Sequence, residues 1–340
     1  ASRGLGDVYK RQNESCDMRD SQNRDIWFLD FVIVSDPVNA PKRDMRYLIG
    51  KIYDMYVNNT SQTEKWRRSN DRKLYIRDME LNEREAIFLL CYADGLVPNI
   101  PITNLDTNEQ REEKLLNREA KPLTSHLIIK LDSNSENPFR FQGILEESSY
   151  INRERVQTYF NFLLRKIAKE DSNFEMDSTN GERDAKGQIK KCKFKNLFEV
   201  QGHLSKDFYK AIENGKLTNI SLVSDDIHLN YADDLTVRPV TKSISIKPVN
   251  DKWGDRIREH IDSSRRIAND NNYGLVKISF KSSDKTSHTV SLDSSSGNVF
   301  GNGFIRRERI NGFPQLLSEA EQHINTSIKV KMLRLFERGV

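Results

Sequence analysis

Apolar positions along the chain follow two patterns, short uninterrupted runs and stripes at helical spacing. Residues 26–34 form a run rich in aromatic and β-branched side chains, which stops at Asp36-Pro37. Such a run, closed by a proline turn, predicts a buried strand. The next segment carries apolar residues at helical spacing, at Met45, Leu48, Ile49, Ile52, Met55 and Tyr56. This stripe predicts a helix that buries one face.

Further elements are expected in the first half of the chain. The runs 73–79 and 86–93 predict strands, and the runs 126–131 and 139–145 predict a hairpin because a polar, proline-containing turn separates them. A helix is then expected from a second apolar stripe, at Val156, Phe160, Leu163, Leu164 and Ile167. Residues 104–121 are dense in Glu, Arg and Asn, which is typical of a solvated helix or an ordered loop.

A polar stretch interrupts this alternation after residue 169. Residues 170–191 contain too few apolar side chains to offset the entropy lost on ordering, so we expect a linker or exposed loop over 170–192. The sequence therefore predicts an N-terminal domain over 13–169 and a C-terminal domain over 193–340.

Helices and strands alternate again in the second half. Ser205 is a suitable N-cap for a short helix that carries Phe208 and ends at Gly215. A second helix is expected over 253–268, and a third from Pro314 onward. The stripe of the third helix recurs every four residues, at Leu316, Ala320, Ile324, Ile328, Met332 and Phe336. Strands are expected at 217–223, 243–247, 275–281 and 289–292. The irregular order predicts an α+β fold of two domains, each with a mixed or antiparallel sheet packed against helices.

Composition narrows the class of protein. Of 340 residues, 36% are hydrophobic and 31% are charged, and no apolar run is long enough to cross a bilayer, so membrane insertion is not expected. The three cysteines, Cys16, Cys91 and Cys192, are few, odd in number and widely spaced, which favours a reducing compartment. Without an apolar leader at the start, a cytoplasmic location is the expectation.

The first twelve residues are expected to be non-native. The string from Ala1 to Gln12 resembles a translated sequencing-adapter tail on a reading frame from a metagenomic assembly. On that interpretation residues 1–12 contribute nothing to the fold, and the sequence does not identify the natural N-terminus.

Motifs for metal, cofactor or nucleophilic chemistry are not found. The histidines stand apart from one another, at His126, His203, His228, His260, His288 and His323. We therefore assign no metal site, no cofactor and no catalytic residue. The glycine-rich segment 297–303 lacks the Lys-Ser/Thr of a P-loop, although its amides beside neighbouring arginines could hold a phosphate. Two acidic pairs, Asp225-Asp226 and Asp233-Asp234, leave a Mg²⁺-dependent nuclease as an alternative.

The distribution of charge is the most informative feature. Residues 238–340 hold 18 Lys/Arg against 11 Asp/Glu, whereas the whole chain has a net charge of only +4. A one-sided basic segment is typical of a polyanion-binding surface. The candidate phosphate contacts are Arg258, Arg265, Arg266, Arg306, Arg307 and Arg309. Because no base-reading motif is present, we expect these contacts to be made to the nucleic-acid backbone.

The order of elements in the C-terminal half is similar to that of RexA-type phage-exclusion proteins. The resemblance rests on residues 243–248, a basic helix, residues 276–281, a polar turn and the terminal segment 332–338. The first domain of that family is also similar to the stretch from Leu127 through the 156–167 helix. The resemblance implies a bacterial, non-enzymatic, DNA-binding homodimer that acts in anti-phage defence with a membrane-protein partner. Segments 104–121 and 170–191 depart from the family's pattern as insertions.

The leading hypothesis is a non-enzymatic DNA-binding protein that contacts the nucleic-acid backbone through its basic C-terminal domain. The first domain would supply dimerisation or partner contacts. The alternatives are a metal-dependent nuclease that uses the aspartate pairs and a protein–protein interaction module whose positive charge serves only solubility.

Overall fold

A computed structural model gives the fold of the chain. It describes residues 23–61, 72–96, 100–116, 119–133, 137–178, 183, 187–224, 241–246, 256–283, 285–300 and 303–338. Helices and antiparallel strand pairs occur together, which confirms the predicted α+β class. In the described part of the chain, none of the helices is long and apolar enough to cross a bilayer.

The chain divides into two compact units. Unit 1 is formed by Ala1–Trp27, Phe31–Glu199 and Glu308–Val340, and unit 2 by Phe28–Asp30 and Val200–Arg307. These boundaries differ from the expected division at 170–192. Residues 195–199 belong to unit 1 because they lie in a strand of its sheet, and the C-terminal segment belongs there because its helix packs on that sheet.

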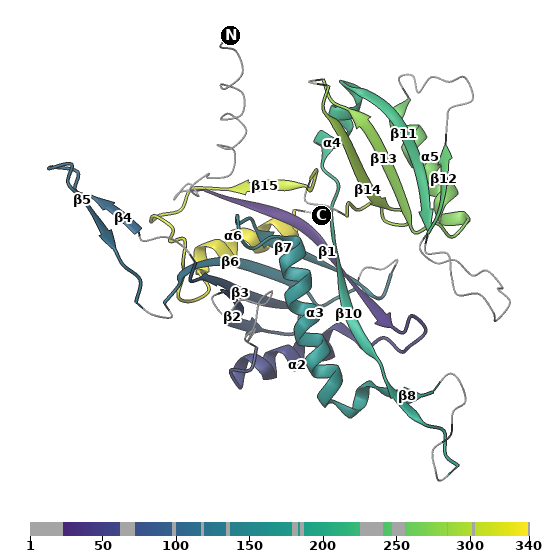
Figure 1. The fold of residues 1–340 in the computed structure, drawn as a ribbon, viewed down its shortest axis with the longest axis horizontal. Helices are drawn as coiled ribbons and strands as arrows, with labels where there is room; N and C mark the ends of the chain where they lie inside the picture. Colours follow the sequence, from purple (N-terminus) through teal and green to yellow (C-terminus); the bar gives the residue numbers. More distant parts are fainter. Residues whose placement is uncertain are drawn as a thin grey trace. The chain divides into compact units, whose positions relative to one another are not determined.

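Unit 1 is built around a seven-stranded sheet (Figure 1). Its path is β10-β1-β7-β6-β3-β2, and β15 pairs with β1. The strands are β1 (Arg24–Asp36), β2 (Arg72–Leu81), β3 (Glu85–Asp94), β6 (Lys121–Lys130), β7 (Arg140–Glu146), β10 (Lys195–Gly202) and β15 (Arg307–Ile310). The predicted strands 73–79 and 86–93 and the predicted hairpin 126–131/139–145 are confirmed as β2, β3 and the antiparallel pair β6–β7.

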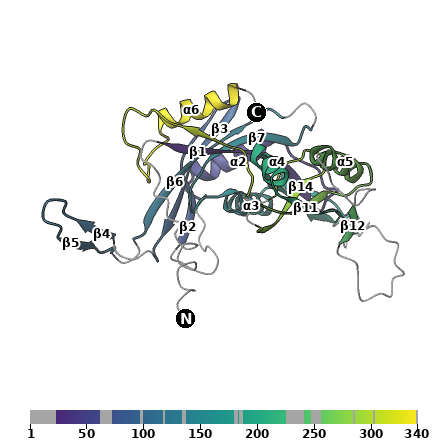
Figure 2. The ribbon, with the colours of Figure 1, turned by 90° about the horizontal axis from the view of Figure 1, so that it is seen from above.

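Helices cover both faces of this sheet, as Figure 2 shows. On one face lie α2 (Met45–Val57) and α3 (Arg153–Glu170), and Phe160 of α3 contacts the ring of Phe88 edge-on at 5.2 Å. On the other face lies α6 (Thr326–Glu337), where the Lys130 ammonium stands 4.4 Å from the Phe336 ring. Coverage on both faces explains why β3 reads as a nearly continuous apolar run.

The last predicted helix is wrong in its first half. The helix begins only at Thr326, with Asn325 as its N-cap, and residues 311–325 follow an irregular path. The backbone of this segment forms hydrogen bonds with strands of the unit 1 sheet. Thr124 N–H donates to Glu319 O at 3.0 Å, and Ile324 N–H donates to Asp78 Oδ2 at 2.9 Å. These hydrogen bonds to the sheet replace those that a helix would have made.

Two polar segments contain strands that were not expected. Within 104–121 the chain completes an antiparallel ribbon, β4 (Ile100–Thr103) with β5 (Gln110–Glu113), so the expected helix or loop is wrong there. Asn104 closes the turn by accepting a hydrogen bond from Asp106 N–H, and Asn108 adopts a left-handed backbone. Within 170–191 the short strands β8 (Glu175–Asp177) and β9 (Lys191–Lys193) also pair antiparallel.

Unit 2 contains a four-stranded antiparallel sheet in the order β12-β11-β13-β14. The strands are β11 (Lys216–Ser224), β12 (Lys242–Ile246), β13 (Leu275–Lys281) and β14 (Ser287–Asp293). Helices α4 (Lys206–Glu213) and α5 (Ile257–Asp270) cover one face of it (Figures 1 and 2). Phe208 of α4 meets Phe280 of β13 edge-on at 6.0 Å, which fixes the covered face as the core.

Candidate nucleic-acid interface

The six predicted phosphate contacts lie on separate elements. Arg258, Arg265 and Arg266 lie on α5, while Arg306 and Arg307 stand at the start of β15. Arg309 follows within β15 but belongs to unit 1. The structure therefore supports only the α5 group as arginines that share one helix.

Two of the α5 arginines already have protein partners. Arg258 Nε donates to Glu213 Oε1 at 2.9 Å, and its guanidinium lies 4.8 Å from the Tyr209 ring centroid. Arg265 pairs with Asp262 at 3.7 Å and donates to Ser295 O at 3.2 Å. Only Arg266 of this group is exposed without a described partner among the residues that the structure covers.

Arg265 also packs tightly against the glycine-rich loop. Gly297 has φ +76, and a Cβ at this position would lie 2.6 Å from Arg265 Cζ. Glycine adopts that left-handed backbone without strain, and a larger residue would displace the end of the Arg265 side chain. The Arg265 side chain is only 23% exposed, so its packing holds the glycine-rich loop in place.

The remaining arginines are engaged within the protein too. The Arg306 guanidinium lies 4.1 Å from the centroid of the Phe28 ring, a cation–π contact. Arg309 forms a bidentate pair with Asp25, with both nitrogen–oxygen distances 2.8 Å. Each of these two groups would have to give up or share an existing contact to bind a phosphate.

The face of the unit 2 sheet opposite its helices is a polar surface that the arginine-based prediction missed. We call this surface the open face; it comprises Lys216, Asn219, Ser221, Val223, Ser243, Ser245, Leu275, Lys277, Ser279, Lys281, Ser287, Thr289, Ser291 and Asp293. Hydroxyl groups and lysines dominate it, and Asp293 at one end is its single carboxylate. Val223 lies at the same end and is buried, and Leu275 opposite it is half-buried.

Cross-strand register places serine hydroxyl groups and lysine side chains next to one another on this face. Ser245, Ser221, Lys277 and Ser291 follow one another across the four strands. Lys216 and Lys281 are directly opposite in the β11–β13 pair. The approach is close because Gly215 has no side chain: a Cβ there would lie 2.2 Å from Lys281 O. Across the described ranges, none of the three open-face lysines has a carboxylate within ion-pair distance.

The chemistry of the open face fits phosphate. Lysine ammonium groups and Ser, Thr and Asn side chains are the groups that contact phosphate and sugar oxygens in protein–DNA complexes. Opposed like charges destabilise a strand pair, so an anion held between Lys216 and Lys281 would relieve that repulsion. A strand alternation of apolar with Ser, Thr and Lys, as in Leu275–Lys281, is the sequence signal for this surface.

Unit 1 contains a buried ionic cluster that connects several of its elements. Glu146 Oε1 lies 2.8 Å from Arg24 Nε, and Glu146 Oε2 lies 2.7 Å from His126 Nδ1, with these side chains at most 2% exposed. On the far side of the ring, His126 Nε2 accepts from Asn325 N–H at 3.0 Å. Since Nε2 accepts, the proton of the neutral ring sits on Nδ1, facing Glu146. The cluster joins β1, β6, β7 and the start of α6.

Unit 2 contains a second buried carboxylate. Asp30 accepts from Asn298 Nδ2 at 2.7 Å and lies 2.9 Å from His203 Nε2. His203 is also held by its backbone, since its N–H donates to Phe28 O at 2.9 Å. The pair fixes the 298–300 segment beside Phe28–Asp30.

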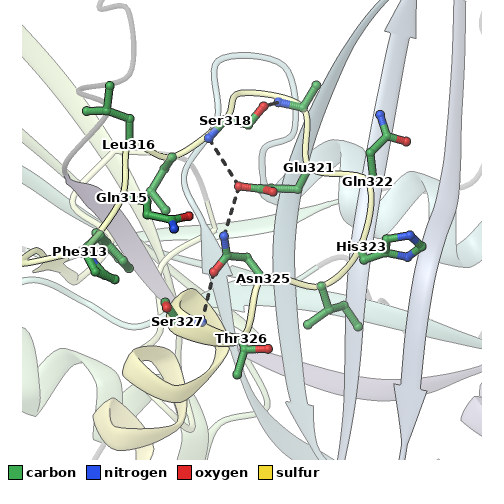
Figure 3. Close-up of a pocket in the computed structure, with 14 residues that line it drawn as sticks. Phe313, Gln315, Leu316, Ser318, Glu321, Gln322, His323, Asn325, Thr326 and Ser327 are labelled. Carbon is green, nitrogen blue, oxygen red and sulfur yellow. Dashed lines mark hydrogen bonds between the residues drawn. The ribbon is translucent and has the colours of Figure 1, made fainter.

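A pocket of about 510 Å³ lies in unit 1, lined by the irregular segment before α6 and the first turn of that helix (Figure 3). Its polar groups bind one another: Glu321 Oε1 accepts from Asn325 Nδ2 at 3.2 Å and from Ser318 N–H at 3.3 Å. Asn325 Oδ1 in turn caps Ser327 N–H at 3.0 Å. Glu321 thus supplies the negative charge that a helix N-terminus favours, which leaves little attraction for an anion.

No cluster of His, Cys, Asp or Glu side chains suited to a metal ion occurs within the part of the chain that is described. The candidate nuclease aspartates, Asp225, Asp226, Asp233 and Asp234, lie outside the described residues. Comparisons with protein-family models, curated proteins and solved structures found no match.

Proposed function

We propose that the protein binds DNA without catalysis and that unit 2 contacts the phosphate backbone through its open face. The observation that carries this proposal is the opposed pair Lys216 and Lys281, together with Lys277, on a face rich in hydroxyl groups. Positive charge supports it in the second part of unit 2, where 13 Lys/Arg stand against 7 Asp/Glu over residues 238–307, whereas the full segment 200–307 holds 16 against 13. The interface shifts from the predicted arginines to the sheet, because Arg258 and Arg265 already have partners.

The expected magnitude follows from counterion release. Each phosphate neutralised on duplex DNA contributes about 0.9 to the slope of log K against log salt. Substituting Lys277→Gln and Lys281→Gln together should therefore flatten the slope by about 1.8. The same relation gives a loss of about 60-fold at 0.1 M salt, which shrinks as the salt concentration approaches 1 M.

Fluorescence anisotropy of a labelled duplex of about two helical turns, titrated at several salt concentrations, measures both quantities. The matched control is Arg165→Gln with Lys169→Gln, which removes two exposed charges from α3 of unit 1 and should leave the slope unchanged. A third variant, Arg258→Gln with Arg266→Gln, tests the α5 surface. An unchanged slope in the Lys277/Lys281 variant would remove the open face from the interface, and a loss confined to the α5 variant would move the interface to the helix.

The same titration separates the alternative functions. Cleavage of the duplex with Mg²⁺ would favour the nuclease, and absence of binding even at low salt would favour the protein-interaction module. The cytoplasmic location, the homodimer, the membrane-protein partner and the anti-phage role remain predictions from the sequence and from the resemblance to RexA-type proteins. Light scattering of the purified protein tests the dimer directly.

A further inference from the structure

Unit 2 contains the same succession of elements twice. Helix α4 is followed by strands β11 and β12, and helix α5 is followed by strands β13 and β14. The sheet order β12-β11-β13-β14 places the first strand of each half at the centre and the second strand of each half at an edge. Both helices lie on the same face of the sheet (Figure 1).

The sequence carries a trace of the same repeat. Residues 214–224 and 272–282 align without a gap at a spacing of 58, and five of the 11 positions are identical. The identical pairs are Asn214/Asn272, Leu217/Leu275, Ile220/Ile278, Ser221/Ser279 and Ser224/Ser282. The helices obey a slightly different spacing, because the second half has four residues between helix and strand where the first half has two.

Strand register shows that the two halves are related by a local twofold axis. Ile220 lies directly opposite Ile278, its own counterpart in the repeat, so the axis passes between these two residues. The neighbouring pairs obey the same symmetry, because Ser221 opposite Lys277 becomes Ser279 opposite Asn219. The symmetry ends at the bulge between Leu217 and Asn219.

The open face therefore presents two equivalent hydroxyl pairs. Ser221 and Ser245 lie opposite each other with their Oγ atoms 3.5 Å apart, and the symmetry-related Ser279 and Thr289 have oxygens 3.0 Å apart. Lys277 and Asn219 occupy the equivalent positions between these two pairs. The centre of the face thus carries the same hydroxyl arrangement on both sides of the axis, with Lys277 matched by Asn219. The ends differ, because Lys281 corresponds to Val223 and Lys216 to Gly274.

We infer that the nucleic acid bound by the open face is a duplex, with each half of unit 2 contacting one of the two strands. This inference rests on the proposed function. The two backbones of a duplex run antiparallel and are related by local twofold axes, which is why symmetric proteins bind duplex DNA with their twofold axis on that of the DNA. A single strand has no such axis and cannot present the same phosphate geometry to both halves.

The composition of the open face supports a duplex over a single strand. Proteins that bind single strands stack bases on aromatic side chains. The open face has no aromatic residue among its fourteen positions, all of which are described. Its groups suit phosphate and sugar oxygens, which a duplex exposes on both strands.

The first test compares a duplex with a single strand of the same length. Charge density alone favours the duplex, because the salt slope is about 0.9 per phosphate for a duplex and about 0.7 for a single strand. For three lysine contacts at 0.1 M salt this difference amounts to about fourfold. We expect a preference well above that, on the order of tenfold or more. Equal affinities, or a preference within fourfold, would overturn the inference.

The second test compares the two halves. Ser221→Ala with Ser245→Ala removes the hydroxyl pair of one half, and Ser279→Ala with Thr289→Val removes the other. Each double variant should lose duplex affinity by a similar factor, about tenfold. A loss confined to one half would refute the symmetric arrangement.

A third test uses a variant that should gain affinity for the duplex, because misfolding can explain a loss of binding but not a gain. Asn219→Lys makes the central positions of the two halves equivalent by placing a lysine opposite Ser279, as Lys277 lies opposite Ser221. One added phosphate contact should raise duplex affinity about eightfold at 0.1 M salt. The control Asn269→Lys adds the same charge on the exposed surface of α5 and should have little effect. Equal gains from both variants would contradict the inference.

The two proposals fail in different ways. If Lys277→Gln with Lys281→Gln leaves the binding of both polymers unchanged, the open face is not the interface and the proposed function fails. If that variant loses binding but single strands bind as well as duplexes, only the inference about the duplex fails.

Discussion

The buried ionic cluster of unit 1 gives a stability prediction that the structure defines closely. Glu146 lies 2.8 Å from Arg24 Nε and receives hydrogen bonds from the backbone and the ring of His126. The substitution Glu146→Gln keeps the size and one acceptor oxygen but removes the charge. The Arg24 guanidinium then stays buried, with its ion-pair partner gone.

The expected cost is large because the site excludes water. Removal of one partner from a buried ion pair costs about 3–5 kcal/mol, whereas loss of an exposed pair costs about 0–1 kcal/mol. For a unit of this size, 1 kcal/mol corresponds to about 2–4 °C, so the melting temperature should fall by about 6–20 °C. The matched control is Glu319→Gln, whose pair with Lys121 at 3.7 Å is 41% exposed on both sides and should cost less than about 1 kcal/mol.

Thermal unfolding followed by tryptophan fluorescence in a Trp66→Phe, Trp253→Phe background, with urea titration as a second measurement, reports on this unit because Trp27 lies buried in β1. A decrease no larger than that of Glu319→Gln would refute the assignment of a dry, charged cluster. The double substitution Arg24→Met with Glu146→Gln removes both charges and keeps an acceptor oxygen for the two His126 donors. It should recover much of the stability lost in Glu146→Gln, since no charge is left buried without its partner.

Two further predictions concern packing and acid stability. Phe160 is fully buried and meets Phe88 edge-on, so Phe160→Ala should cost about 3–5 kcal/mol in urea titration, and a loss below about 1 kcal/mol would contradict its central place in the core. Burial opposes ionisation of Asp171, but hydrogen bonds, chiefly from Tyr47 and with a further contribution from Lys51, lower its pKa to about 2. Because the folded pKa lies below the unfolded value of about 3.9, Asp171 stabilises the fold above pH 4 and loses this effect as the pH falls toward 2. Asp171→Asn should therefore cost about 1–2 kcal/mol at pH 7 and much less at pH 2, and a pH-independent difference between the melting curves would contradict the ionic origin.

The strands were predictable because their environment produces a clear pattern. β13 has the predicted bounds, and β3 extends the predicted run by one residue at each end. A strand buried on both faces needs a continuous apolar run, and a strand with one open face needs alternation, so both kinds can be read from sequence. The β4–β5 ribbon follows neither rule, because its short strands make no core, and it was missed.

The last helix shows where periodicity misleads. Its apolar stripe continues back to Leu316, yet this side chain is 72% exposed and lies in irregular structure. The backbone of this segment is held by hydrogen-bond acceptors in the sheet, at Asp78 and His126, which lie about two hundred residues or more away in sequence. A repeat of four residues carries no information about such distant acceptors, so tertiary hydrogen bonds overrode the local pattern.

The candidate interface could not be located from charge alone. Arginines attract attention in a sequence, but whether they are available depends on partners that the sequence does not reveal. Glu213, which engages Arg258, lies on a different helix and 45 residues away. The open-face lysines lie on strands where they alternate with core residues, and only the strand order shows that no carboxylate of the described residues forms an ion pair with them.

The internal repeat was hidden for a related reason. The two halves differ in the length of the helix–strand connection and in the chain between their two strands, which spans residues 225–241 in the first half and 282–286 in the second. Only about eleven residues align without a gap, too few to stand out in a chain with many Ser and Asn residues. Strand register supplies what the alignment lacks, because it pairs Ile220 with Ile278 and fixes the axis independently of sequence identity. The similarity of two short segments becomes an argument about ligand geometry once those segments are the two central strands of one sheet.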